Sequence, residues 1–123
     1  MWKTYIRPAT IEDALNNLSK FSETSRVIAG ATDLMLEMER GVRKGVDTLI
    51  DITSIPGLDE IRMDHSGWIH IGPLVTHNAC ASSQLIREHG FPLALASWSV
   101  GSPQIRNRAT IAGNVITASP AND

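Results

Sequence analysis

The fold of this chain is decided by residues 27–34, which read Val-Ile-Ala-Gly-Ala-Thr-Asp-Leu. A short apolar run ends at a turn of small residues, and a helical pattern begins directly after it. Such a strand–turn–helix junction directs backbone N–H groups and the positive end of the helix dipole at one point. We expect Gly30 to adopt positive φ, and Thr32 and Asp33 to cap the helix. The junction predicts an anion site, most often for phosphate, or else a junction without a ligand.

The residues around this junction alternate between helix and strand patterns. Thr10 is placed to cap a helix with Ile11, Ala14, Leu15 and Leu18 on one face. Pro92 stands where a buried helix over 93–100 would begin. The remaining expected elements are strands at 26–29 and 48–52, a hairpin over 60–72, and helices at 32–38, 76–81 and 83–88. The chain is therefore predicted to be α+β, with a small βαβ-like arrangement first.

Composition narrows the possible functions. The 123 residues carry a formal net charge of -2, which argues against nucleic acid as a partner. No apolar run approaches the roughly 20 residues that cross a bilayer, so we expect no membrane span. The first residues lack the apolar stretch of a signal peptide, which predicts a cytoplasmic protein. With one cysteine, Cys80, the chain forms no internal disulfide and holds no cysteine-ligated iron–sulfur cluster.

A second informative segment, residues 110–123, reads Thr-Ile-Ala-Gly-Asn-Val-Ile-Thr-Ala-Ser-Pro-Ala-Asn-Asp. Short hydrogen-bonding side chains alternate there with alanine and glycine. A surface of that kind suits a flat heterocycle and its polyol tail, which need close backbone approach and convergent polar groups. The run Ser-Pro-Ala-Asn at 119–122 is equally suited to a plain turn.

Together the two segments resemble the FAD-binding subunit or domain of the xanthine dehydrogenase family, which includes carbon monoxide dehydrogenase medium subunits and other molybdenum hydroxylases. That family carries an Ala-Gly-Gly-Thr-Asp-Leu-like loop and later a Gln-Ile/Val-Arg-Asn-x-x-Thr-Ile-Gly-Gly-Asn segment that continues into Ser-Pro-x-x-Asp. Here residues 29–34 read Ala-Gly-Ala-Thr-Asp-Leu and residues 104–114 read Gln-Ile-Arg-Asn-Arg-Ala-Thr-Ile-Ala-Gly-Asn. Ala31 and Ala112 stand where the family often has glycine.

The resemblance implies the FAD-binding fold of the vanillyl-alcohol-oxidase and carbon monoxide dehydrogenase type of flavoprotein. Residues 1–55 would form the first FAD-binding subdomain. Residues 56–123 would form the N-terminal part of a second, truncated subdomain, because family subunits are usually more than twice as long. On that account we expect residues 1–123 alone to bind FAD weakly or not at all and to be inactive.

FAD is the cofactor that the resemblance implies. The 29–34 loop would hold its pyrophosphate through backbone amides, and Thr110, Gly113 and Asn114 would lie along the flavin and its phosphates. Ser119 and Asp123 would add polar contacts near the ribityl chain and ring, with Val100 as an apolar contact and Thr76 as a weaker polar one. The implied cofactor-binding residues are Ala29, Gly30, Ala31, Thr32, Asp33, Leu34, Thr76, Val100, Thr110, Gly113, Asn114, Ser119 and Asp123.

The implied activity is that of an FAD-dependent oxidoreductase subunit. Its partners would be an iron–sulfur subunit, which delivers electrons to FAD, and a molybdenum-cofactor subunit, where substrate is oxidised. FAD would pass the electrons to an external acceptor. We expect no catalytic acid or base and no metal ligand in this chain. The alternative is a non-catalytic scaffold or assembly fragment of the same fold that does not bind flavin alone.

Other side chains have simpler interpretations. The pair His77 and Cys80 supplies too few ligands for a closed zinc site, and Cys80 is expected to be buried. Arg106 is a candidate phosphate contact, although arginines more often pair with acidic neighbours. Trp68 and Trp98 are expected to be buried, with a place near a subunit interface as the alternative.

Overall fold

The computed structural model describes residues 1–122. The chain divides into two compact units, the first spanning Met1–Pro56 and the second beginning at Gly57. Each unit has its own hydrophobic cluster and is described by itself.

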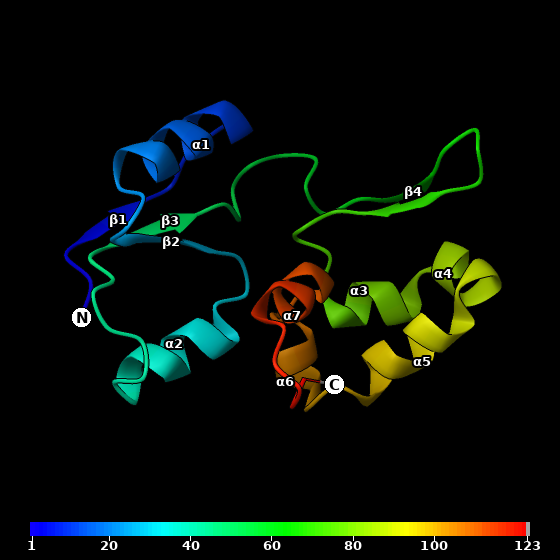
Figure 1. The fold of residues 1–123 in the computed structure, drawn as a ribbon. Coiled ribbons are helices and arrows are strands. Elements are labelled where there is room, and N and C mark those ends of the chain that lie inside the picture. The colour runs from blue at the N-terminus through cyan, green and yellow to red at the C-terminus, as the bar shows by residue number, and fades with distance from the viewer. Residues whose placement is uncertain (123) are drawn as a thin grey trace. The chain divides into compact units, whose positions relative to one another are not determined.

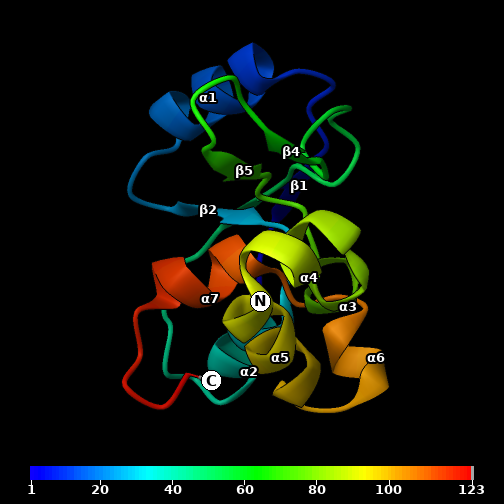
Figure 2. The same cartoon turned by 90° about the vertical axis from the view of Figure 1, so that its right-hand side faces the viewer.

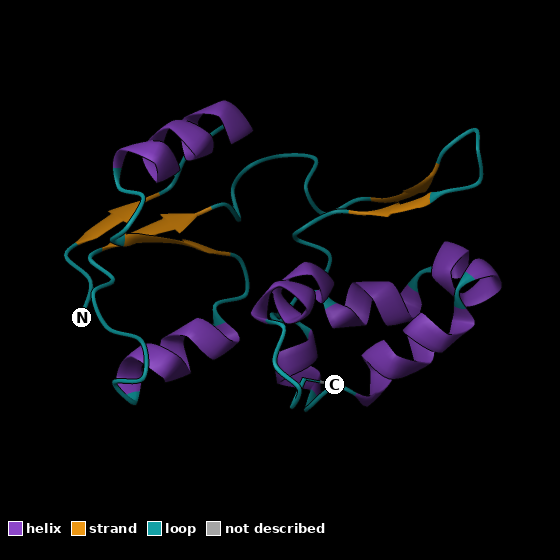
Figure 3. Cartoon of the chain, in the orientation of Figure 1, coloured by secondary structure: helices purple, strands orange, loops and turns teal. Residues whose placement is uncertain are grey.

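The first unit is a three-stranded parallel sheet with two helices. Its elements in chain order are β1 (Thr4–Ile6), α1 (Ile11–Lys20), β2 (Ser25–Ile28), α2 (Thr32–Glu39) and β3 (Thr48–Asp51). The strand order is β1-β3-β2, so both helical connections are crossovers between parallel strands. Right-handed crossovers that run in opposite directions along a sheet place their helices on opposite faces, and α1 and α2 do lie on opposite faces (Figures 1 and 3). The expected βαβ-like arrangement is confirmed.

The central strand explains the core of this unit. All four residues of β3 are buried, because the strand has neighbours on both edges and a helix over each face. Leu49 packs with Ile28 and Val46 in one cluster beneath α2. On α1, the expected cap is confirmed, since the Thr10 side chain accepts the Asp13 N–H at 3.1 Å.

The apolar stripe predicted for α1 is only partly correct. Ala14 is buried, but Ile11 and Leu15 are exposed on the flank of the helix. A three-stranded sheet is too narrow to cover more than part of that stripe. Strand β1 was not predicted, because a three-residue edge strand has no pattern of its own and forms only by pairing with β3.

Within residues 57–122, the second unit combines a hairpin with five short helices. Its elements are β4 (Ile61–Met63), β5 (Ile69–Ile71), α3 (His77–Ser82), α4 (Gln84–His89), α5 (Phe91–Ser99), α6 (Pro103–Arg106) and α7 (Ile111–Thr117). Helices α3, α4 and α5 pack around a cluster of Val75, Cys80, Ile86 and Ala94 (Figure 2). The hairpin lays its alternate isoleucines on that cluster, as the period of two in a strand requires. The expected hairpin and the burial of Cys80 are confirmed.

One close approach in this unit requires glycine. The Gly72 N–H donates to the Glu60 carbonyl at 2.9 Å, where the chain leaves the hairpin. A Cβ on Gly72 would lie 2.2 Å from the Leu58 carbonyl oxygen, well inside contact distance. No other residue type fits there without moving the backbone.

The burial predicted for α5 is only partly correct, and the burial predicted for Trp68 and Trp98 is wrong. Phe91, Leu95 and Trp98 form one exposed face of α5, at 58%, 55% and 62% exposure. The helix is apolar on every side, so its sequence does not tell which side meets the core, and only Ala94 and Ser97 are buried. Trp68, in the hairpin turn, is 73% exposed. Within residues 1–122, no helix has both the length and the apolar character needed to cross a bilayer.

Candidate functional site

The first candidate segment lies where β2 ends and α2 begins. The residue with left-handed backbone is Ala31, at φ 60° and ψ 12°, and not Gly30 as predicted. For an L-residue with a Cβ, that conformation costs about 1–2 kcal/mol. The left-handed residue reverses the chain so that α2 starts immediately after it.

The start of α2 has no side-chain cap. Thr32 and Asp33, predicted as caps, lie inside the first helical turn, while Ala31 occupies the cap position and has no hydroxyl or carboxylate to offer. The Met35 N–H donates to the Ala31 carbonyl at 3.1 Å. The N–H groups of Thr32, Asp33 and Leu34 have no acceptor in the described part of the chain.

These donors fit an anion. Free N–H groups at a helix start carry the positive end of the helix dipole, and phosphate is the ligand they most often hold. Five other helix starts, at Thr10, Thr76, Ser83, Ser102 and Thr110, each have a side-chain oxygen that accepts an N–H. Helix α5 also begins without a side-chain cap, at Gly90, but Pro92 in its first turn has no N–H to donate. The α2 start therefore retains more of its donor capacity than those five, and its donor set fits the pyrophosphate of FAD.

Asp51 is an organising residue at the same edge of the sheet that sequence reasoning missed. Its carboxylate accepts the Thr53 N–H at 2.8 Å, the Thr53 hydroxyl at 2.5 Å, and the Tyr5 hydroxyl. Arg7 approaches to 3.7 Å. Burial alone would raise the pKa of Asp51, but the hydrogen bonds from Thr53 and Tyr5 outweigh it and the pKa is lowered. An acidic residue ending an apolar strand was the available signal.

The Asp51 network fixes the carboxyl ends of two strands. Tyr5 lies on β1 and Asp51 ends β3, so their hydrogen bond ties the two strands together. Because all three strands are parallel, the Ala29–Leu34 loop after β2 emerges at this same edge. Carboxyl ends of parallel strands are where ligands bind in open α/β sheets.

The second candidate segment is built around the paired caps Thr76 and Thr110. These residues form an isolated β-bridge, with the His77 N–H donating to the Ala109 carbonyl at 3.1 Å and the Ile111 N–H donating to the Val75 carbonyl at 3.2 Å. The Thr76 hydroxyl oxygen caps α3 and the Thr110 hydroxyl oxygen caps α7. The structure thus brings together two predicted site residues that are far apart in the sequence. Each hydroxyl keeps its own proton for donation.

The rest of the second segment forms α7 and the turn after it. The Gly113 N–H donates to the Thr110 hydroxyl oxygen at 3.0 Å, and the Thr117 hydroxyl donates to the Gly113 carbonyl at 2.9 Å. The Asn114 carbonyl accepts from the Asn122 side chain at 2.8 Å. The Ser119 hydroxyl oxygen accepts the Ala121 N–H, which confirms the turn predicted at 119–122. Asp123, also predicted as a site residue, lies outside the described residues.

Val100 was expected to contact the cofactor, and Arg106 to contact phosphate or pair with an acidic residue. Val100 is only 9% exposed, so most of its side chain is packed within the second unit. Arg106 has no carboxylate within ion-pair distance in residues 1–122 and instead lies over the Trp98 ring, 5.0 Å from its centroid. Its guanidinium donates to the Val100 and Gly101 carbonyls at 3.1 and 3.2 Å. The expected pairing with an acidic neighbour is wrong.

The candidate residues are divided between the two units. Residues 29–34 belong to the first unit, whereas Thr76, Val100 and residues 110–119 belong to the second. That the two segments line one cleft for a flavin stays a prediction. Among residues 1–122, no three histidine, cysteine, aspartate or glutamate side chains gather in a way that could hold a metal ion.

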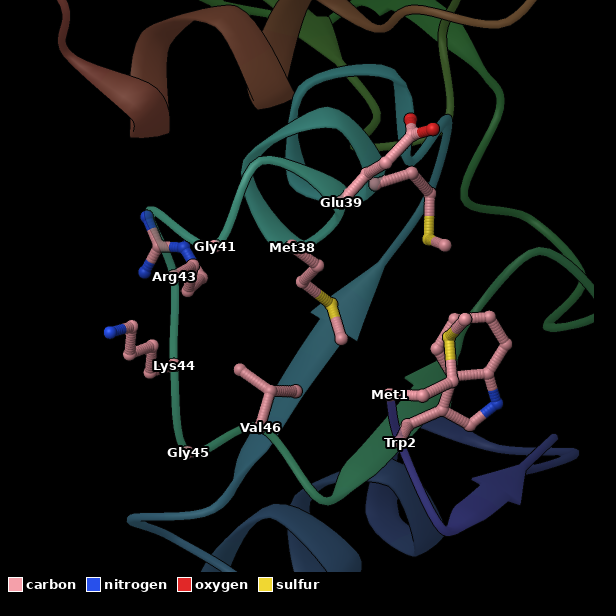
Figure 4. Close-up of a pocket in the computed structure, with 10 residues that line it drawn as sticks. Met1, Trp2, Met38, Glu39, Gly41, Arg43, Lys44, Gly45 and Val46 are labelled. Carbon is pink, nitrogen blue, oxygen red and sulfur yellow. The ribbon is translucent and has the colours of Figure 1, made fainter.

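A pocket of about 590 Å³ in the first unit is separate from the α2 start. It is lined by the N-terminal residues, the second half of α2 and the loop before β3. Figure 4 shows Met38 and Val46 pointing toward one another, with Lys44 on the loop and Trp2 across the pocket. No residue of the 29–34 loop lines it, so this pocket is not the candidate anion site.

Comparison with known proteins gives a consistent result. Residues 2–123 match the family described as the FAD binding domain in molybdopterin dehydrogenase. The chain is 39% identical to the nicotinate dehydrogenase FAD-subunit of Eubacterium barkeri, over 97% of this chain and 40% of that protein. It is 34% identical to the nicotine 6-hydroxylase medium subunit of Paenarthrobacter nicotinovorans, over 97% of this chain and 41% of that protein.

Solved structures agree. A chain of carbon monoxide dehydrogenase from Hydrogenophaga pseudoflava matches with a TM-score of 0.93 and 30% identity, over 100% of this chain and 42% of that one. The expected fold class is therefore confirmed. The chain spans about two-fifths of the length of these relatives.

Proposed function

The chain belongs to the family of FAD-binding domains in molybdopterin dehydrogenases, and on that premise we propose that it serves as the flavin module of a molybdenum hydroxylase-type oxidoreductase. FAD is the cofactor that defines this family. When bound, FAD supplies the redox chemistry, taking electrons from iron–sulfur clusters and passing them to an external acceptor. The contribution of this chain is to bind and orient the flavin.

The observation that carries the proposal is the uncapped start of α2. The N–H groups of Thr32, Asp33 and Leu34 have no acceptor in residues 1–122, and the helix dipole adds positive potential there. We assign the FAD pyrophosphate to these donors. The small residues Ala29 and Gly30 would allow it to approach the backbone closely. The Asp33 carboxylate only accepts hydrogen bonds, so its partner in FAD would be a hydroxyl or an N–H and not a phosphate.

The second segment is proposed to supply the remaining contacts. The Thr76 and Thr110 hydroxyls accept cap N–H groups and retain their protons, which suits donation to phosphate or ribityl oxygens. Gly113 and Asn114 would lie along the flavin, with Ser119 and Asp123 nearer its ribityl chain. The small exposed part of the Val100 side chain would make an apolar contact to the flavin.

The assembly is proposed from the relatives' names. The matched proteins are called an FAD-subunit and a medium subunit, which supports partners that carry the iron–sulfur clusters and the molybdenum cofactor. A cytoplasmic location is part of the same proposal.

Flavin titration of the natively purified protein tests the proposal. Bound flavin should give visible absorbance, and added FAD should bind more tightly than riboflavin, which lacks the pyrophosphate. Thr32→Glu places a carboxylate in the first turn of α2, where it favours the helix but repels an anion, so the Kd for FAD should rise about tenfold or more with folding intact. Leu36→Glu, at an exposed position further along the helix, is the matched control. Equal affinities for FAD in both variants would remove the α2 start from the site.

A further inference from the structure

Arg106 connects several parts of the second unit through one side chain. Its Nη1 donates to the Val100 carbonyl at 3.1 Å and the Gly101 carbonyl at 3.2 Å, and its Nε donates to the Asn78 Oδ1 at 3.2 Å. The guanidinium also lies over Trp98. Arg106 therefore binds the turn between α5 and α6 to the start of α3.

Asn78 completes this connection from the other side. Its Nδ2 donates to the Asn107 Oδ1 at 2.6 Å and to the Pro103 carbonyl at 3.4 Å. One short side chain on α3 thus holds both ends of α6. The residues that follow α6 lead directly into Thr110 and α7.

Three of the candidate cofactor positions of the second unit, namely Thr76, Val100 and Thr110, are connected through this pair. Thr76 precedes Asn78 by two residues at the start of α3, and Val100 is bound through its carbonyl to Arg106. Thr110 follows the α6 segment that Asn78 holds, and it is bridged back to Thr76. These positions lie on different elements, so their mutual placement depends on side-chain contacts between the elements.

We propose that Arg106 and Asn78 are a positioning pair that holds Val100 and the Thr110–Asn114 segment in place against Thr76 for flavin binding, without themselves contacting the flavin. The inference rests on the proposed function, because it assumes that these positions meet FAD.

The chemistry of Arg106 supports positioning. Its acceptors are neutral carbonyl and amide oxygens of its own unit, at hydrogen-bond distance, and its flat face is occupied by Trp98. A planar guanidinium can reach three acceptors from a fixed fork while stacking on an aromatic ring, whereas a lysine ammonium cannot. Its other nitrogen, Nη2, has no acceptor in residues 1–122, so a direct contact to phosphate is the competing account and must be separated by experiment.

Three variants of the natively purified protein separate the two accounts: Arg106→Lys, Arg106→Gln and Asn78→Ala. If the pair positions the segment, all three should raise the Kd for FAD and for riboflavin by the same factor, about 10- to 100-fold by analogy with residues that orient metal ligands. The visible spectrum of bound flavin should change in each variant. Arg87→Gln, an exposed arginine on α4, makes the same charge change in the same unit and should alter neither.

A second measurement does not depend on flavin. Amide hydrogen exchange at His77 and Ile111 reports the two backbone hydrogen bonds that bridge Thr76 and Thr110. Exchange should be faster in the Arg106 and Asn78 variants and unchanged in Arg87→Gln.

The outcomes are distinct. Loss of affinity for FAD but not riboflavin, or full affinity in Arg106→Lys, would identify a phosphate contact and overturn the proposal, as would unchanged exchange at His77 and Ile111. Absence of flavin binding by the unchanged protein, tested as the full-length native subunit and not as residues 1–123 alone, would refute the proposed function. Faster exchange in the variants would then still support the pair's role in holding the segment.

Discussion

Replacement of Gly113 by alanine should destabilise the protein when Thr110 is present and stabilise it when Thr110 is replaced by alanine. Alanine in place of glycine inside a helix normally stabilises by about 1 kcal/mol. Here, however, a Cβ on Gly113 would lie 2.8 Å from the Thr110 hydroxyl oxygen, which accepts the Gly113 N–H at 3.0 Å. Threonine is stiff about χ1, so the hydroxyl can escape only by giving up the cap.

The magnitudes follow from those contacts. Loss of the cap costs about 1 kcal/mol, and Thr110 is only 6% exposed, so a hydroxyl left without a partner there costs about 1–3 kcal/mol more. Set against the gain of about 1 kcal/mol in helix propensity, Gly113→Ala alone should destabilise the second unit by about 1–3 kcal/mol. In a Thr110→Ala background the obstruction is gone, and Gly113→Ala should stabilise by about 1 kcal/mol.

Urea unfolding of the four proteins of this double-mutant cycle measures the effect. Tryptophan fluorescence reports the second unit mainly through Trp68 and Trp98, whereas Trp2 lies in the first unit. Thr110→Ser, which retains the hydroxyl and the cap, is the control and should cost little. The reasoning would be refuted if Gly113→Ala stabilised the protein equally with and without Thr110.

Three further predictions concern single positions. Gly72→Ala should prevent folding of the second unit, seen as lost helical circular dichroism, because its Cβ would meet the Leu58 carbonyl at 2.2 Å; a folded variant contradicts this. Ala118→Gly should stabilise by roughly 0.5–1 kcal/mol in urea unfolding, since it removes the strain of φ 50° at the end of α7 but gives the unfolded chain more freedom; destabilisation would show that the strain is absent. The pKa of Asp51 is lower in the folded protein than its usual value of 3.8, so the unfolded chain takes up the proton first as pH falls. The stability that this carboxylate contributes is therefore present above pH 3.8 and is lost as pH falls below it. The difference in unfolding free energy between the protein and Asp51→Asn should therefore shrink from pH 6 to pH 3, and a constant difference counts against the network.

Local patterns predicted much of the secondary structure correctly. The caps Thr10, Thr76 and Ser83 were identified because a hydroxyl residue before a helical pattern has a direct chemical role there. The hairpin was identified because Ser66 and Gly67 separate two alternating runs. These features depend on residues that are neighbours in the chain.

The errors came from features that neighbours do not determine. The left-handed backbone conformation occurs at Ala31, although the local sequence favours it at Gly30. The path of the chain from β2 into α2 is set by the packing of α2 on the sheet. Trp98 is exposed because α5 is apolar on every side and only the tertiary packing selects the buried side. Arg106 donates to backbone carbonyls and lies over an aromatic ring, contacts that no local sequence pattern predicts.

The amino-acid sequence by itself determined the two small-residue segments, their order and their chemistry, because hydroxyls and missing side chains are properties of residue type and local spacing. Only the tertiary structure decided that Thr76 lies against Thr110, that Asp51 ties β1 to β3, and that α2 starts without a cap. Those contacts join residues that are distant in the chain, and their free energy appears only when the elements have packed.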